Sequence, residues 1–485
     1  MTPQMAESSV KKNIIYNALK TLSSIVFPLI TFPYVSRVLQ PESIGKINFA
    51  SSIVGYFSLL ATLGITVYAV RECSRVKHDR SALSQLASEI FSLNFCTMIL
   101  AYALLVLVLL SVEALHGYEV LIFIQSVSIF FTVIGADWLN TAMEDFRYIT
   151  LRTFVCQLLA LLAMFAFVHS PDHYVIYAII GVVSSSGANI ANLFYRRKFA
   201  SVRLIRNMRW RHHFPSVLLL FSMLIAQAIL NNLDITMLGV LKGDYEVGLY
   251  ATAVKVINII TQVIASVNWV VMPQLSYYFA QKDYDNINRL LHRTLLFTVG
   301  LGLPCIAGVN ALAPEIIIII GGDAYMAAVP CMQILAVSML FSFLSGFYGN
   351  IILLPSLREK QFMIACIVSC VFNAVANFYV IPIWGSSGAA MTTVISLFII
   401  LLICMINTDS RIKLGNRYEI YSAPIIGSVF IVLIGVCARS YIVNMQLRIL
   451  AVTFLSVIFY AIVLYFMKHE FLFLILDSIH KRIFK

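Results

Sequence analysis

Charged residues are scarce in this chain of 485 amino acids. They make up 12% of the sequence, whereas 60% of the residues are hydrophobic and the mean hydropathy is +0.89. A soluble domain carries about 25% charged residues. The shortage of charge therefore excludes a large soluble domain and predicts an all-α, polytopic membrane protein.

The motifs of soluble enzymes are also missing. No Gly-x-x-x-x-Gly-Lys-Ser/Thr phosphate loop, no His-Glu-x-x-His and no Cys/His cluster occurs, so the sequence predicts neither Walker-type ATP hydrolysis nor a metal or cofactor. None of the nine cysteines forms a Cys-x-x-Cys pair, and we expect them to pack as small hydrophobic residues. His212 and His213 fall in a basic loop, where a solvated role is expected. The polar segment 1–12 does not resemble a cleavable signal peptide.

What the sequence has in abundance is long apolar stretches. A membrane-spanning helix needs about 20 apolar residues, and about fourteen stretches meet this requirement. They are Asn13–Val38, Ile47–Val70, Leu86–Leu110, Val120–Thr141, Leu151–Val168, Tyr174–Phe194, Ser216–Val240, Tyr250–Phe279, Leu295–Ile320, Cys331–Leu354, Phe362–Ile383, Gly388–Ile406, Pro424–Tyr441 and Leu447–Met467. We therefore predict about fourteen transmembrane helices.

Basic residues are distributed unevenly among the connecting segments. With the N-terminus placed inside, the inner segments hold 27 of the 34 lysine and arginine residues, and the outer ones hold five: Arg37, Lys46, Lys242, Arg439 and Arg448. Cytoplasmic loops are enriched in these residues, so the distribution predicts that both termini lie inside. It also accounts for the net charge of +11 without nucleic acid, because basic loops lie on anionic lipid headgroups.

The two halves of the chain share weak sequence similarity. Val38–Gly45 resembles Val240–Gly248, with the two glycines 203 residues apart, and Ser185–Ala188 matches Ser386–Ala389 at a spacing of 201. Such spacing indicates two parallel six-helix repeats related by an axis along the membrane normal. The predicted parts are a first lobe at 1–198, a basic cytoplasmic linker at 199–214, a second lobe at 215–410, and two extra helices with a tail at 411–485. The extra helices either add packing or form a wall for a lipid-sized substrate.

Prolines fall inside several of the predicted helices. Pro28 and Pro33 lie in the first, Pro273 in the eighth and Pro304 in the ninth. Proline removes a backbone hydrogen bond and permits a kink, so Pro28 and Pro33 are candidate hinges.

Four stretches make the chain resemble a known family. They are Asp137-Trp138 followed by Glu144 and Ile149-Thr150; Asn232-Leu233-Asp234 with Gly239; Val247-Gly248-Leu249-Tyr250 followed by Lys255; and Ile381-Pro382 followed by Gly385 and Gly388-Ala389-Ala390. In order and spacing they are similar to the multidrug/oligosaccharidyl-lipid/polysaccharide (MOP) exporter superfamily, and within it to Wzx-type O-antigen flippases. The chain departs from that pattern at Asn140 and Ala142, where members often carry an aromatic residue and a glycine.

The resemblance implies a flippase rather than an enzyme. Its substrate would be an undecaprenyl-diphosphate-linked oligosaccharide, an O-antigen or capsular repeat unit, moved from the inner to the outer leaflet of a bacterial inner membrane by alternating access. The membrane potential or an ion gradient would drive the step. Candidate partners besides membrane lipids are H⁺ or Na⁺ and polysaccharide polymerase machinery.

A diphosphate needs cationic partners, and few cations lie at membrane depth. Lys20 and Lys255 fall inside predicted helices, and Lys46 lies at the outer end of the second one. Lysine serves as a point charge for phosphate, although each of the three can instead extend its amine to the membrane surface. We take Lys20, Lys46 and Lys255 as candidate substrate-binding residues.

The hairpin Ala228–Ile259 places further polar groups at depth. Asp234 precedes its loop and Lys255 follows it at a similar distance, so the two are predicted to meet on adjacent helices, with Asn231 and Asn258 nearby. Buried charges are costly unless they are paired. The pair is predicted either to be a static structural contact or to be a switch in which the diphosphate competes with Asp234 for Lys255.

Asp137 and Glu144 are candidate gating residues. They are seven residues apart, so a continuous helix would place them on one face, two turns apart. We expect them at the cytoplasmic mouth, with Glu144 contacting Arg147 or Arg152. A solvated helix end is the alternative.

Other functions remain open at this point. A multidrug cation antiporter of the same superfamily would need an acidic cavity, and a lipid II flippase would use a related substrate. A membrane-embedded transferase is disfavoured because it usually needs a large outer loop, and none of the predicted outer loops is long.

Overall fold

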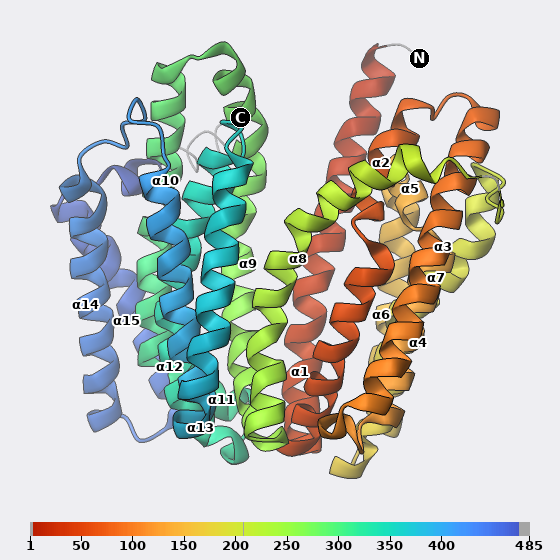
Figure 1. The fold of residues 1–485 in the computed structure, drawn as a ribbon. Coiled ribbons are helices and arrows are strands. Elements are labelled where there is room, and N and C mark those ends of the chain that lie inside the picture. The colour runs from red at the N-terminus through yellow and green to blue at the C-terminus, as the bar shows by residue number, and fades with distance from the viewer. Residues whose placement is uncertain (1–2, 207, 475–485) are drawn as a thin grey trace. The chain divides into compact units, whose positions relative to one another are not determined.

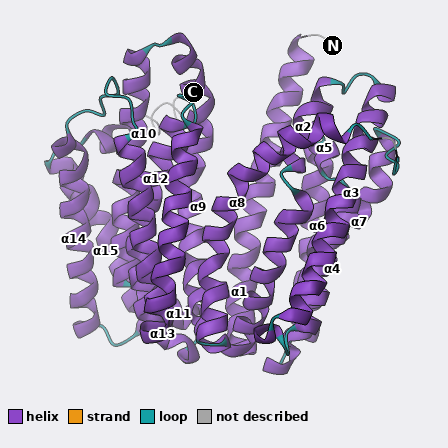
Figure 2. Cartoon of the chain, viewed as in Figure 1, coloured by secondary structure: helices purple, strands orange, loops and turns teal. Residues whose placement is uncertain are grey.

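The computed structural model describes residues 3–206 and 208–474, and all regular structure within them is helical (Figures 1 and 2). Ten helices in this described part are long and apolar enough to cross a membrane. The predicted all-α polytopic membrane class is thereby confirmed. The chain divides into two compact units, residues 1–248 and 249–485.

The first unit contains eight α-helices and three short 3₁₀ turns among its described residues. The α-helices are α1 (Pro3–Thr62), α2 (Ile65–Arg75), α3 (Arg80–Ser111), α4 (Glu119–Gly135), α5 (Trp138–Ala142), α6 (Phe146–Phe167), α7 (Tyr174–Tyr195) and α8 (Trp210–Leu241), and the 3₁₀ turns are η1 (Glu113–Leu115), η2 (Pro171–His173) and η3 (Arg196–Lys198). Helix α9 (Asp244–Gln281) begins in this unit and continues into the second.

Helix α1 spans the first predicted stretch and most of the second, and it bends between them at Gln40. Gln40 has a φ of 65° and a ψ of 167°, and its side chain donates a hydrogen bond to the Arg37 carbonyl. The residue before a proline is driven out of helical geometry, and Pro41 follows Gln40. The departure from helical dihedral angles lies here rather than at Pro28 or Pro33.

Two glycines allow very close backbone contact between α1 and the start of α9. A Cβ atom on Gly45 would lie 1.8 Å from the Asp244 carbonyl oxygen, and one on Gly248 would lie 1.9 Å from the Pro41 carbonyl oxygen. The contacts are reciprocal, because Pro41 and Asp244 hold the same place relative to the two glycines. Only residues without a side chain fit here.

Residues 201–205, a short way before α8, run along α3 with alternate residues facing it. The backbone N–H groups of Ser201, Arg203 and Ile205 donate to the hydroxyls of Ser84, Ser88 and Ser92, at 3.1, 3.1 and 2.9 Å. Two extended residues advance about 6.6 Å and four helical residues about 6.0 Å, so the two repeats stay in step. Each hydroxyl also donates to the carbonyl four residues earlier in α3, which satisfies both of its roles.

The second unit is helical throughout its described residues. Its elements after α9 are α10 (Tyr284–Ala311), α11 (Ala313–Gly321), the 3₁₀ turn η4 (Asp323–Ala328), α12 (Val329–Gly346), the π-helical turn η5 (Phe347–Leu353), α13 (Glu359–Ile406), α14 (Arg417–Tyr441) and α15 (Met445–Phe466). Helix α13 bends at Gly385, which has a φ of 54°.

The sequence prediction differs from the structure at the ninth apolar stretch. Leu295–Ile320 is not one helix: α10 ends at Ala311 and α11 begins at Ala313, with Pro314 in its first turn. Glu315 is buried in α11 and receives Arg439 from α14 and Arg448 from α15, at 3.4 and 2.9 Å. The last two helices therefore pack against the body of the second unit.

Candidate functional site

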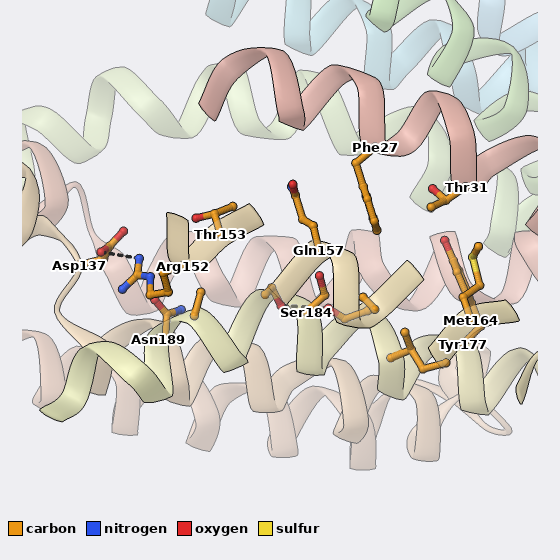
Figure 3. A pocket seen from close by; sticks show the side chains of 15 residues that line it. Phe27, Thr31, Asp137, Arg152, Thr153, Gln157, Met164, Tyr177, Ser184 and Asn189 are labelled. Carbon is orange, nitrogen blue, oxygen red and sulfur yellow. Dashed lines mark hydrogen bonds and ion pairs between the residues drawn. The ribbon is translucent and has the colours of Figure 1, made fainter. Parts of the chain in front are cut away.

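A cavity of about 460 Å³ lies in the first unit between α1, α6 and α7 (Figure 3). Its size falls within the range of small-molecule sites. The side chains that face it are mostly polar, although the surrounding helices were predicted from their apolar character. They include Asp137, Arg152, Thr153, Gln157, Ser184, Ser185 and Asn189.

The spacing of residues along α6 and α7 creates this polar interior. On α6 the lining residues are 152, 153, 157, 160 and 164, and on α7 they include 177, 181, 184 and 188. Residues three or four apart share one face of a helix. Leu151, Leu158 and Leu162 fall on other faces of α6 and are largely exposed. Each helix thus separates a polar stripe toward the cavity from an apolar surface suited to lipid.

An ion pair closes one end of the cavity. Arg152 Nη2 donates to Asp137 Oδ1 at 2.8 Å, and Figure 3 shows both side chains beside Asn189, at the end opposite Met164 and Tyr177. The Arg152 side chain is 6% exposed and that of Asp137 is 35% exposed. The guanidinium also lies over the Tyr148 ring, 5.3 Å from its centre.

Arg152 has hydrogen-bonding capacity that the described residues leave unused. Its Nε and Nη1 atoms are buried without a hydrogen-bond partner in the described part of the chain. Buried donors are normally satisfied, and an unsatisfied one costs about 1–3 kcal/mol. A guanidinium with unused N–H groups, beside amides and hydroxyls, is suited to donate hydrogen bonds to an oxygen-rich ligand.

Asp137 reaches the cavity because the helical chain breaks just before it. Helix α4 ends at Gly135 and Ala136 adopts a left-handed conformation. The buried Asn140 donates to Asp137 Oδ1 at 3.3 Å and also bonds to Asn192, which donates to the Gly135 carbonyl at 2.7 Å. These amides fix the break by satisfying polar groups that a continuous helix would satisfy itself.

The break corrects two predictions about the gating residues. Asp137 and Glu144 do not share a helix face, because α5 ends at Ala142 and Glu144 has a φ of 58°. Glu144 does not contact Arg147 or Arg152 as predicted; its carboxylate pairs with Lys77 at 2.9 Å, in the turn between α2 and α3. Asp137 forms an ion pair with Arg152 instead.

The other predicted site residues are dispersed. Lys46 pairs with Glu42 at 3.4 Å and lies over the Tyr174 ring. Asp234 is buried in α8, whereas Lys255 and Asn258 are exposed on α9. Asp234 belongs to the first unit and Lys255 to the second, so their pairing stays a prediction. The side chains of Lys20 and Asn231 lie outside the described part of the structure.

Sequence reasoning missed the residues that line the cavity. Arg152 was considered only as a partner of Glu144, and Gln157 and Asn189 were not singled out. A signal was present, because Arg152 and Gln157 lie within or at the edge of the apolar stretch that begins at Leu151. Polar side chains at such places usually face a bundle interior or a cavity.

Comparison with known proteins gives two family matches. The model described as "Polysaccharide biosynthesis protein" matches residues 10–279, more than half of the chain, and the MatE model matches residues 220–379.

Two relatives match most of this chain at low sequence identity. A candidate O-antigen transporter of Escherichia coli K12 is 20% identical over 79% of this chain and 93% of its own length. The capsular polysaccharide biosynthesis protein CapF of Staphylococcus aureus is 21% identical over 81% of this chain and 97% of its own length.

Solved structures share the fold. The lipid II flippase MurJ in an inward closed conformation has a TM-score of 0.74 at 16% identity, covering 93% of this chain and 99% of MurJ. An inward-facing MATE family multidrug transporter of the MOP superfamily has a TM-score of 0.60 at 14% identity, covering 86% of this chain and 98% of that one. At these identities the likeness concerns the fold alone.

Proposed function

Because this chain belongs to the polysaccharide biosynthesis protein family, we propose that it moves a lipid-linked oligosaccharide from the inner to the outer leaflet of a bacterial cytoplasmic membrane. The membership confirms the resemblance found in the sequence and places the chain among membrane transporters rather than enzymes. The names of the relatives, an O-antigen transporter and a capsular polysaccharide protein, support an undecaprenyl-diphosphate-linked repeat unit as the substrate.

The observation that carries the proposal is the polar cavity within the first unit. Sugars present hydroxyl groups that both donate and accept, and amides and hydroxyls such as Gln157, Ser184 and Asn189 bond them in either direction. Arg152 adds a charged donor with unused capacity. We assign the cavity to a hydroxyl-rich part of the glycolipid.

The diphosphate needs separate cations. Lys255 is exposed on α9 and remains a candidate, with Asn258 one turn further along. Lys20 remains a candidate as well, and Lys46 is a weaker one because Glu42 already neutralises it. Moving an anion outward is favoured by an inside-negative potential, by about 2.3 kcal/mol per charge per 100 mV. The proposal includes the switch in which the diphosphate competes with Asp234 for Lys255.

We propose the fourteen-helix arrangement with both termini inside as the topology. Counting α1 and α13 as two crossings each, at the bends of Gln40 and Gly385, supports that number. The reciprocal contacts of Gly45 and Gly248 support the two parallel repeats. The boundaries at 198, 214 and 410 are part of the same proposal. Cysteines placed at Asp172 and Lys413 are expected to react with an impermeant maleimide from outside and from inside, respectively.

The test is transport by the purified protein in liposomes. The probe is a fluorescent undecaprenyl-diphosphate oligosaccharide, and its appearance in the outer leaflet is measured with a membrane-impermeant quencher. We expect Arg152→Gln to lower the rate strongly. Arg147→Gln is the matched control, because Arg147 is exposed in the first turn of the same helix and does not line the cavity.

The outcomes separate the alternatives. Equal rates for both arginine variants at equal protein levels would remove the cavity from the mechanism. Export of organic cations in place of glycolipid would favour the multidrug alternative, against which Arg152 stands because it neutralises Asp137. Faster movement of lipid II than of a longer oligosaccharide would identify a lipid II flippase.

A further inference from the structure

A second buried polar cluster lies outside the cavity, where α2, α3 and α8 meet. Glu89 of α3 and His213 of α8 are 2% and 1% exposed, and His213 Nε2 lies 2.8 Å from Glu89 Oε2. On the other side of the ring, His213 Nδ1 lies 2.7 Å from the hydroxyl of the buried Tyr68 in α2. The sequence analysis expected His213 to be solvated, and that expectation is wrong.

Glu89 also receives a permanent cation. Arg209, the residue before α8, donates from Nε to both carboxylate oxygens at 3.1 Å, and its own side chain is 63% exposed. The remaining polar or titratable groups around the cluster are Gln85 on α3, Arg71, Glu72 and Cys73 on α2, and His212 beside His213. Apolar residues that include Ile65, Leu83 and Val217 pack around the cluster.

One charge state of the cluster satisfies the hydrogen-bonding requirements of all its groups. A carboxylate only accepts, so His213 Nε2 must carry a hydrogen. If Nδ1 carries none, the Tyr68 hydroxyl donates to it and every group is satisfied. The described arrangement is therefore complete with a neutral imidazole, an ionised Glu89 and Arg209 as the balancing charge.

A buried carboxylate needs one positive partner, and here two groups can supply it. Arg209 supplies it from the solvent side, while a proton on His213 Nδ1 would supply it from within, with the Tyr68 oxygen then accepting. With both in place, the imidazolium and the guanidinium repel each other beside a single carboxylate, so each weakens the binding of the other. Arg209 can leave at little cost because most of its side chain is already in solvent.

We propose that Glu89 and His213 form a proton-binding site in which a proton taken up by His213 replaces Arg209 as the partner of Glu89. Departure of Arg209 loosens residues 201–205 from α3, because their three serine contacts lie shortly before it in the chain. Among side chains, histidine is the one whose ordinary pKa lies between about pH 5 and 8.

The site names a coupling ion for the proposed transport. Helix α8 carries His213 in its first turn and Asp234 further along, so proton and substrate would act on one helix. This consequence rests on the proposed function, but proton binding itself does not.

Hydrogen exchange of the full-length protein in nanodiscs tests the proposal. The amides of residues 201–205 should be protected at pH 8 and lose protection as the pH falls toward 5, after correction for intrinsic exchange. Residues 407–411 are an internal reference, because hydrogen bonds from Arg411 hold the pKa of Asp409 well below its usual range and keep that pair ionised.

Three variants define the result. Arg209→Gln removes the group whose departure loosens the segment, so residues 201–205 should be unprotected at both pH values and show no transition. His213→Gln should keep the segment protected at both pH values, because its amide still donates to Glu89. Glu89→Gln should leave it unprotected at both.

A transition that persists in His213→Gln, or wild-type protection that does not change with pH, would overturn the proposal. If Glu89→Gln does not fold, the other two variants still decide it. A protein that shows the transition but moves no glycolipid would refute the proposed function and leave the proton site standing. Glycolipid movement without the transition would refute the proton site and leave the proposed function standing.

Discussion

The two ends of α8 are held by opposite kinds of contact. At its C-terminal end, Gly239 faces the Phe49 ring, where an added Cβ would come within 2.1 Å, and the following chain meets α1 at Gly45 and Gly248. At its N-terminal end, His213 and Arg209 hold Glu89 through hydrogen bonds. One end depends on the absence of side chains and the other on ionisable ones.

The difference concerns what can change at each end. Close packing of glycine against backbone has a single good arrangement, and it responds to volume rather than to pH. A buried cluster with one anion and two candidate cations has two arrangements that differ by a proton. A helix attached in these two ways is fixed at one end and adjustable at the other.

The largest expected effect comes from adding a methyl group at the fixed end. Gly45→Ala and Gly248→Ala each place a Cβ within 2 Å of a carbonyl oxygen, and overpacking of this kind costs about 1–3 kcal/mol or more. We expect a large drop in thermal unfolding temperature. Gly308→Ala in α10 is the control, because it meets no atom within 4 Å and should stabilise by up to about 1 kcal/mol. Equal behaviour of the three variants would contradict the packing argument.

The next effect comes from removing the anion at the adjustable end. Glu89→Gln leaves Arg209 and His213 without a charged partner, and we expect a loss of about 1–3 kcal/mol at pH 8. The loss stays moderate because Arg209 is mostly solvated. Thermal unfolding of wild type and variant at pH 8 measures it, with Glu42→Gln, whose carboxylate is largely exposed in its pair with Lys46, as the control. No loss at pH 8 would mean that the cluster does not hold α8.

A smaller effect is expected from the serine contacts. Ser88→Ala removes the acceptor of the Arg203 N–H, and a single hydrogen bond contributes about 1 kcal/mol. Hydrogen exchange at residues 201–205 should rise several-fold at pH 8. Ser185→Ala, whose hydroxyl bonds only within its own helix among the described contacts, should leave that segment unchanged. A matching rise in both variants would point to a global effect.

The smallest effect is expected at the hydroxyl contacts near the fixed end. Thr236 meets the hydroxyls of Ser52 and Tyr56 at 3.0 and 3.2 Å. Thr236→Val keeps the shape, and Ser52 keeps its bond to the Phe49 carbonyl, so we expect a loss of about 0.5–1 kcal/mol. The loss should be the same at pH 8 and pH 5.5. A loss confined to one pH would remove the contrast between the two ends.

Much of the helical plan could be predicted because membrane helices depend on local properties. Apolar length located most of the helices, and the match of residues 10–279 agrees with the resemblance drawn from short motifs. The bend at Gln40 falls between the first two predicted helices, where a loop was expected, but its backbone conformation was not predicted. A positive φ leaves little trace in a sequence.

The errors at the site have a common physical cause. Trp138–Ala142 contains no helix breaker, and the break beside it is held by Asn192, about 50 residues away in sequence. His213 lies in a basic segment, and its burial depends on α2 and α3. Glu89 could have been found, since a lone acid in an apolar stretch implies a buried partner.

The pairing of an extended segment with α3 also limits how the length of this connection can change. Each second residue of 201–205 meets each fourth residue of α3. Removing two residues would let this segment shift by one helical turn along α3 and recover most of its hydrogen bonds. Removing one would point its N–H groups away from the serines, since alternate residues of an extended chain face opposite sides. Insertions and deletions in this connection should therefore be tolerated in pairs.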